Sequence, residues 1–281
     1  MEVGQVSQPL LFELPDLPTP GWHPSDLGAG THLHWASPAE IESRLDAAYY
    51  VITRRPERRL DGLNCPLSPL EEWAAVNPVE RRLPTERGYL LYEECLYAQV
   101  GDVRDGCWLL GPGLSVKAVR DLPVRAAYQP EPGDLLLPRV YSSLHKAVLV
   151  LETGMPLVAS SAFALLKPRS RMHGLALLGL LHHRLLGEQL WALASGTTVR
   201  SVSVGKVGLL QVPQIAAGQR AALAAQVEAA LHTQQMVHFP GLHTSLSWYW
   251  QDGSMRYWRH QMQALALQVE GMIDQVLGRQ A

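Results

Sequence analysis

Cysteine and long apolar runs are scarce in this chain of 281 residues. The three cysteines, Cys65, Cys95 and Cys107, are too few and too far apart for a zinc site or a disulfide framework. Such sparse cysteine fits a reducing cytoplasm. The apolar run at 175–181 is far too short to span a bilayer, and the N-terminus lacks the basic-then-apolar pattern of a signal peptide. We therefore expect a cytoplasmic protein with no membrane partner.

Signatures of catalysis are also missing. The dipeptide Gly205-Lys206 lacks the preceding glycine of a nucleotide-binding loop and is followed by valine. None of the four lysines follows an acidic residue by two positions, as the lysine of the usual metal-dependent nuclease motif does. Asn77-Pro78-Val79 lacks the second proline and the aromatic residue of the adenine-methyltransferase loop. Since Gly-x-Ser-x-Gly and a glycine-rich cofactor loop are absent too, we expect neither an enzyme nor a bound cofactor.

The histidines do not predict a metal site. His182 and His183 are adjacent in a predicted helix and point to different faces, so they cannot share one metal ion. His32 and His34 share a face of an extended segment but have no third ligand nearby. From the sequence we expect no metal.

Lysine is rare, whereas arginine is abundant, at 4 against 20 residues. The planar guanidinium of arginine binds phosphates and guanine edges with two hydrogen bonds, which lysine does not do. A GC-rich genome gives the same excess of arginine over lysine. The net charge of −2 argues against a wholesale polyanion binder. A local basic face remains compatible with this balance.

The order of patterns predicts an α+β fold with a twisted, partly open sheet. Residues 1–43 are proline-rich and predict an extended arm. Residues 44–213 predict a globular domain, in which strands at 89–91, 107–110, 135–137, 147–151 and 162–166 precede one helix at 175–194. Residues 214–281 predict a helical region, with helices at 216–238 and around 255–276.

The last helix carries a heptad seam, because apolar residues recur at alternating steps of three and four. Such helices pack either on the chain's own core or on a partner, and the long helices favour the partner. The predicted interface residues are Leu223, Val227, Met255, Trp258, Met262, Leu265, Val269, Met272 and Val276.

A small, hydroxyl-rich turn is the feature most suggestive of function. Gly196, Thr197, Thr198, Arg200 and Ser201 open an alternating segment, predicted as a strand at 200–204, ahead of an apolar run that ends at Pro213. Such a turn exposes backbone N–H groups, hydroxyls and a guanidinium together, which suits a nucleic-acid backbone. We expect it to contact DNA.

Five landmarks occur in a fixed order around this turn. They are the segments 44–50 (RLDAAYY), 89–92 (YLLY), 132–139 (PGDLLLPR), 158–165 (VASSAFAL) and 196–219, from Gly196-Thr197-Thr198 through Val212-Pro213 to Gln219. Together they resemble a target recognition domain of the type I restriction–modification specificity (S) subunit family. The resemblance covers residues 44–238 and implies a half-size member, because the chain has room for one recognition domain only. The expected break in the helical region at 239–254 departs from the single long helix common in the family.

The resemblance implies a non-catalytic subunit that reads a half-site in double-stranded DNA. Its implied partners are a DNA methyltransferase subunit, with or without a restriction subunit, and a second copy bound through the C-terminal helices. Besides the turn, the implied DNA-facing residues are Arg139, Tyr141, Ser142, Ser143 and Lys146, whereas Gly133-Asp134 is expected to be a structural turn. Arg139 fits a DNA contact or a surface salt bridge equally well.

A second arginine group could clamp the DNA backbone or lie in a solvated loop; it comprises Arg54, Arg55, Arg58 and Arg59. A different class of function also fits the pattern. The chain could be an assembly or regulatory protein that keeps the recognition fold without reading sequence, and its net acidity and few lysines favour that alternative slightly.

Overall fold

The computed structural model describes most of the central part of the chain. It covers residues 66–238, apart from 85, 87–89, 104–106, 111–113 and 196–199, and also 10–15, 31–36, 264 and 267–275. Within the proline-rich segment, β1 (Leu10–Pro15) and β2 (Thr31–Ala36) pair as an antiparallel ribbon.

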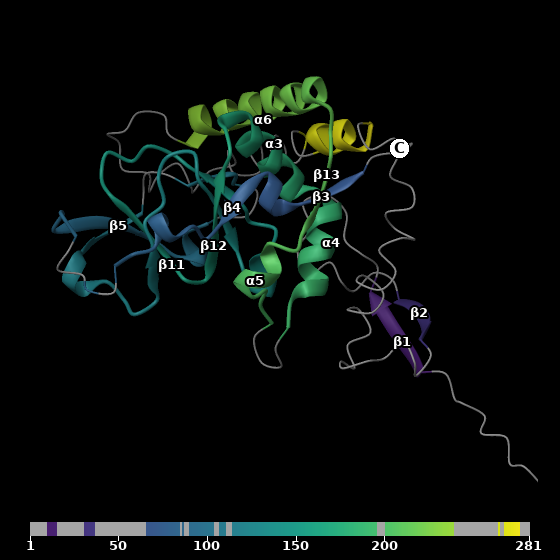
Figure 1. The fold of residues 1–281 in the computed structure, drawn as a ribbon, viewed down its shortest axis with the longest axis horizontal. Coiled ribbons are helices and arrows are strands. Elements are labelled where there is room, and N and C mark those ends of the chain that lie inside the picture. Colours follow the sequence, from purple (N-terminus) through teal and green to yellow (C-terminus); the bar gives the residue numbers. More distant parts are fainter. Residues whose placement is uncertain are drawn as a thin grey trace, which may run out of the picture.

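Two mixed sheets form the centre of the fold (Figure 1). The first has the order β4 (Ala74–Val76), β12 (Phe163–Pro168), β9 (Leu135–Pro138), β10 (Val148–Val150) and β6 (Leu109–Leu110). The second has the order β7 (Ser115–Ala118), β5 (Glu94–Ala98), β11 (Leu157–Ser160) and β8 (Ala126–Tyr128). The pairs β10–β6 and β11–β5 are parallel and the other pairs in these sheets are antiparallel. The α+β prediction is therefore confirmed.

The first sheet lies between two apolar layers, which explains why its strands are apolar without interruption. Leu135 and Leu137 of β9 face the helices, whereas Leu136 between them faces the second sheet. Leu165 and Leu166 of β12 divide in the same way. Because successive side chains of a strand point to opposite faces, each such strand contributes to both cores.

Four of the five predicted strands are present, as β6, β9, β10 and β12. The prediction at 89–91 is wrong for Leu90 and Leu91, which precede the strand; β5 begins at Glu94. Leu91 is fully exposed, whereas Leu90 is partly buried and packs against the core beside the second sheet.

The predicted helix at 175–194 is two helices, α3 (Arg171–His182) and α4 (Arg184–Leu193). His183 interrupts them with an extended backbone, at φ −79° and ψ 143°. Its Nδ1 accepts a hydrogen bond from the backbone N–H of Leu185 at 3.2 Å and so caps α4. Apolar residues recur at helical spacing on both sides of the polar break at 182–184, which is why periodicity alone did not reveal it.

The helix α6 (Ala217–His238) confirms the prediction at 216–238, and a further helix covers 267–275. Both pack on α3 at Gly179, where a Cβ atom would lie 2.9 Å from Cγ2 of Val227 and 3.3 Å from Cγ1 of Val269. In Figure 1, α6 crosses above α3, and the C-terminal helix lies beside it in yellow. These helices therefore share a core with the sheet domain.

Short elements complete the described chain. The strand β13 (Gln211–Pro213) pairs antiparallel with β3 (Leu67–Pro69). The predicted strand at 200–204 is wrong, because Ser201 forms isolated bridges only and a short helix, α5 (Val204–Val207), begins at its end. The 3-10 helices are η3 (Leu70–Glu72), η4 (Val79–Arg81), η6 (Val100–Asp102), η7 (Val119–Asp121) and η8 (Tyr141–Ser143).

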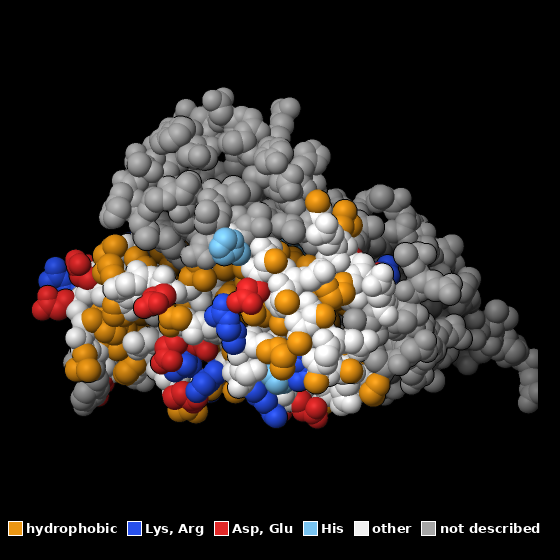
Figure 2. All heavy atoms as spheres, turned by 90° about the horizontal axis from the view of Figure 1, so that it is seen from above, with side chains coloured by type: hydrophobic (Ala, Val, Ile, Leu, Met, Phe, Trp, Pro, Cys, Tyr) orange, Lys and Arg blue, Asp and Glu red, His pale blue; other side chains and the backbone are white. Residues whose placement is uncertain are grey.

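The face in Figure 2 carries acidic and basic side chains side by side, with scattered apolar groups between them. Mixed charge of this kind does not make a basic patch on that face. Across the described helices, none combines the length and apolarity that crossing a membrane requires.

Candidate nucleic-acid interface

The backbone joins two segments that the sequence predicted to face DNA. Tyr141 N–H donates to the carbonyl of Arg200 at 2.9 Å, and Val202 N–H donates to the carbonyl of Arg139 at 2.8 Å. On the other side, Ser195 and Ser201 exchange two hydrogen bonds of 2.9 Å, which close the base of the turn. Residues 139–146 and the described residues of 195–206, which are 195 and 200–206, are thus linked through their backbones and are called the joined segments below.

Aromatic rings hold the side chain of Arg200. Its guanidinium carbon lies 5.2 Å from the ring centre of Tyr141 and 5.4 Å from that of Trp191. The same group donates to the carbonyl of Ala194 at 3.4 Å, and the Trp191 indole N–H donates to the Tyr141 hydroxyl. A guanidinium stacked on rings keeps its charge and a fixed orientation, so Arg200 braces the contact between Tyr141, Trp191 and the backbone at Ala194.

The joined segments are rich in cations and poor in acids. Lys206, on α5, donates to the carbonyl of Leu193 at 3.4 Å, and Lys146 donates to the carbonyl of Val103 at 3.5 Å. The sequence contains no Asp or Glu at 135–151 or at 189–227. In a chain of net charge −2, the joined segments are therefore locally basic.

Hydroxyl groups also occur along the joined segments, at different depths. Ser142 is exposed and Ser201 is half-buried, which leaves both accessible to solvent. Ser143 is 8% exposed and its N–H donates to the carbonyl of Val140, so it serves the η8 turn.

Arg139 is half-buried, and its Nε atom has no hydrogen-bond partner within the described residues. No ion pair links Arg139 to a described carboxylate. The salt-bridge alternative from the sequence therefore gains no support in the described part of the chain.

The Gly133-Asp134 pair is structural, as expected. Gly133 has φ +94°, a conformation that favours glycine. Asp134 is 3% exposed and accepts from the Arg81 Nε and from the Glu131 N–H, each at 2.9 Å. Burial raises the pKa of Asp134, and these hydrogen bonds oppose that rise. The pair thus directly precedes β9 and contributes no exposed side chain.

Several predicted site residues lie outside the described residues. They are Arg54, Arg55, Arg58 and Arg59 of the arginine group, Gly196, Thr197 and Thr198 of the turn, and Met255, Trp258, Met262, Leu265 and Val276 of the seam.

The described seam residues are placed inside the chain itself. Leu223, Val227 and Val269 are 1%, 0% and 3% exposed within the core around α3, and Met272 packs against the same core. The expectation that these four face a partner is thereby corrected: they cover the chain's own core, which was the other reading of the seam. Burying an apolar stripe needs only one suitable surface, and α3 supplies it.

Trp191 contacts the joined segments and Lys206 belongs to them, and neither was predicted to contact DNA. Trp191 lies in α4 and is 5% exposed; its indole N–H donates to the Tyr141 hydroxyl, and the Arg200 guanidinium lies over its ring. Lys206 fits neither the nucleotide-binding loop nor the metal-dependent nuclease motif. The absence of acids around Lys206 was the available signal in the sequence.

Comparison with known proteins gives structural neighbours only. No protein-family model and no curated protein sequence matches the chain. The structure is similar to the HsdS subunit from Thermoanaerobacter tengcongensis, with 16% identity and a TM-score of 0.47, over 61% of this chain and 43% of that one. A structure described for complex assembly and conformational transition of the type I R-M system has 17% identity and a TM-score of 0.49, over 61% and 44% of the two chains.

A third neighbour is the type I restriction-modification S subunit from M. genitalium, with 9% identity and a TM-score of 0.40, over 70% of this chain and 43% of that one. The matched region thus spans less than half of the length of each of these three proteins.

Proposed function

We propose that the chain is a DNA sequence-specificity subunit of a restriction–modification-type system. It binds a half-site in duplex DNA through the joined segments and acts in the cytoplasm without catalysis of its own. The joining of two locally basic, acid-free segments by backbone hydrogen bonds is the observation that carries this proposal. The ordered motifs of the sequence support the same function.

The chemistry of the joined segments supports contact with a phosphate backbone. Guanidinium, ammonium and hydroxyl groups are the usual donors to phosphate oxygens. Arg200, Lys206 and Ser201 lie on one continuous piece of chain, and Arg139 and Tyr141 are hydrogen-bonded to it through the backbone. Packing by Tyr141 and Trp191 holds Arg200 in place before DNA arrives, which reduces the entropy lost on binding.

The dependence of binding on salt tests this assignment of residues. Each lost phosphate contact reduces the slope of log K against log salt by about one. We expect Lys206→Ala and Lys146→Ala each to reduce the slope in this way. Lys117→Ala is the matched control, because Lys117 is exposed on β7 of the second sheet, and it should leave the slope unchanged. Equal slopes for all three variants would contradict a contact through the joined segments.

We further propose that the chain positions a DNA methyltransferase subunit, with or without a restriction subunit. We also propose that it forms a homodimer through its C-terminal helical region. Co-purification from the native host, with identification of a methyltransferase in the complex, tests the partner. Sedimentation at several concentrations tests the homodimer, and a monomer at every concentration would contradict it.

The alternative is a non-catalytic assembly or regulatory protein that keeps the fold without reading sequence. The net charge of −2 is the observation that favours it. Duplex binding with no preference for any sequence, or no binding, together with a stable protein partner would select this alternative.

A further inference from the structure

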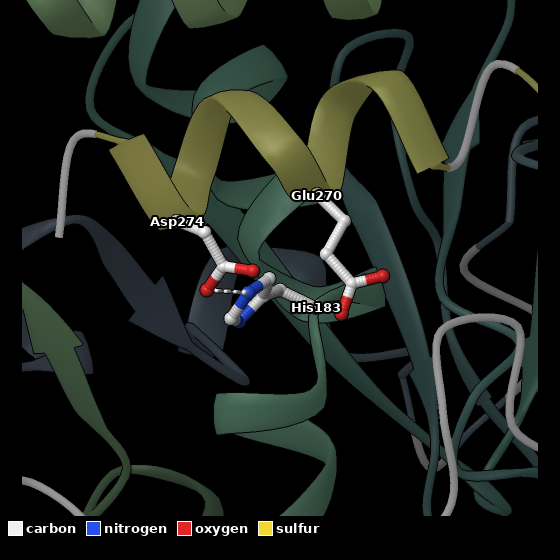
Figure 3. A group of neighbouring side chains, drawn as sticks. All are labelled: His183, Glu270 and Asp274. Atoms are coloured by element: carbon white, nitrogen blue, oxygen red, sulfur yellow. Dashed lines mark ion pairs between the residues drawn. The ribbon is translucent and has the colours of Figure 1, made fainter. Parts of the chain in front are cut away.

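A cluster of three ionisable side chains links the C-terminal helix to the break between α3 and α4 (Figure 3). Glu270 and Asp274 are four residues apart, so both point from one face of their helix toward His183. The potential ligand atoms of the three residues all lie within 4.8 Å of one another. The distance from the His183 Nε2 to the Asp274 Oδ1 is 3.5 Å.

We propose that His183, Glu270 and Asp274 bind one divalent transition-metal cation, such as Zn²⁺, that fastens the C-terminal helix to the α3–α4 junction. The proposal concerns folding of the chain and does not depend on DNA binding. One imidazole and two carboxylates are a donor set that transition metals accept, whereas Mg²⁺ and Ca²⁺ prefer oxygen donors alone.

The spacing and burial of the donors favour a cation. Zn²⁺ with ligands at about 2.0–2.1 Å has neighbouring donor atoms about 3.3 Å apart in a tetrahedral site, close to the His183–Asp274 separation. Glu270 is 6% exposed, and its Oε2 atom is buried without a hydrogen-bond partner within the described part of the chain. Because the three donor atoms lie within 4.8 Å of one another, ligation requires the side chains to move inward, and the fourth position of a tetrahedral site remains for water.

The existing charges leave room for a cation. The guanidinium of Arg184 forms ion pairs with both carboxylates, at 3.7 Å from the Asp274 Oδ1 and 4.0 Å from the Glu270 Oε1. With both acids ionised, one guanidinium leaves a net negative charge at a mostly buried site, which is costly. Since the Arg184 side chain is 41% exposed, it can move into solvent when a cation binds.

Metal binding changes which ring nitrogen of His183 carries the proton. Its Nδ1 accepts from the Leu185 N–H, so the neutral ring of the metal-free chain carries its proton on Nε2. Ligation through Nε2 displaces that proton, leaving the neutral ring protonated on Nδ1, and the Leu185 cap bond opens. Loss of the hydrogen bond to Leu185 opposes metal binding, whereas neutralisation of the two carboxylate charges by the cation favours it.

The test uses the full chain, treated with a chelator and titrated with ZnCl₂ at pH 8. Burial raises the pKa of Glu270 to about 7, so this carboxyl is mainly ionised at that pH. We expect saturable binding that Glu270→Gln and Asp274→Asn each weaken at least about tenfold. Asp121→Asn removes an exposed carboxylate on η7 and should bind as the unmodified chain does. Titration with MgCl₂ should give no comparable binding.

Nitrogen NMR of His183 provides a readout that does not require the variants to fold. Zinc should convert the ring from the Nε2-protonated to the Nδ1-protonated form. Unchanged zinc affinity in both variants, or an Nε2-protonated His183 at saturating zinc, would overturn the proposal, and so would the absence of saturable binding.

Discussion

Replacement of Arg200 by alanine tests whether the joined segments form a rigid, pre-formed element. The guanidinium contacts two aromatic rings, at 5.2 and 5.4 Å from their centres, and one backbone carbonyl, at 3.4 Å. Two partly buried cation–π contacts contribute about 1 kcal/mol together, and the hydrogen bond contributes about 1 kcal/mol. Arg200→Ala should therefore lower the free energy of unfolding by about 2 kcal/mol.

Urea unfolding followed by circular dichroism measures this loss. Arg120→Ala is the control, because Arg120 is 88% exposed on η7 and should change the free energy by less than about 0.5 kcal/mol. Arg200→Lys keeps the charge but loses the planar group, so we expect it to recover less than half of the loss. A loss for Arg200→Ala no larger than that of the control would refute the bracing role.

Three further predictions concern the stability of the sheet and helix framework. Gly179→Ala should lower the free energy of unfolding by about 1–3 kcal/mol, because the added Cβ would meet Val227 and Val269. In α4, the added Cβ of Gly187→Ala meets no atom within 4 Å, so this control should raise the free energy of unfolding by up to about 1 kcal/mol. Denaturant unfolding of both variants checks these two expectations. Burial lowers the pKa of His182 to about 4, below the unfolded value of about 6.5, so the unfolded state binds the extra proton first. The contribution of His182 to the free energy of unfolding should then fall by up to about 3 kcal/mol as the pH is lowered from 6.5 to 4, and it should stay constant above pH 6.5. The difference in free energy of unfolding between the unmodified chain and His182→Gln, measured across pH, isolates this contribution. Asn77→Ala should lower the free energy of unfolding by about 3 kcal/mol, because the buried Asn77 side chain accepts from the Leu165 N–H and donates to the Tyr128 hydroxyl, both at 2.6 Å. A loss below about 1 kcal/mol would show that these hydrogen bonds do not hold the two sheets together.

Local sequence patterns predicted many of the strands and helices, because the signals for these elements lie within short stretches of the chain. Buried strands such as β9 and the long helix α6 appear as apolar runs or helical periods. The break at His183 could not be predicted, since the helical pattern continues on both sides and the cap depends on the placement of one imidazole ring.

The two joined segments were each singled out in the sequence, but the contact between them was not predicted. The turn at 196–201 and the segment at 139–146 were both named, yet nothing local shows that Tyr141 pairs with Arg200. The same limit applies to His183, Glu270 and Asp274, because their proximity arises from docking of the C-terminal helix. Heptad spacing predicted an apolar stripe and could not decide which surface covers it.

The most direct test of the proposed function is selection of duplexes from a randomised DNA pool by the purified chain, with and without a methyltransferase partner. Our account predicts an enriched sequence motif, and weaker recovery of that motif with Lys206→Ala than with Lys117→Ala. Recovery of no motif in either condition would contradict the role of the chain as a specificity subunit.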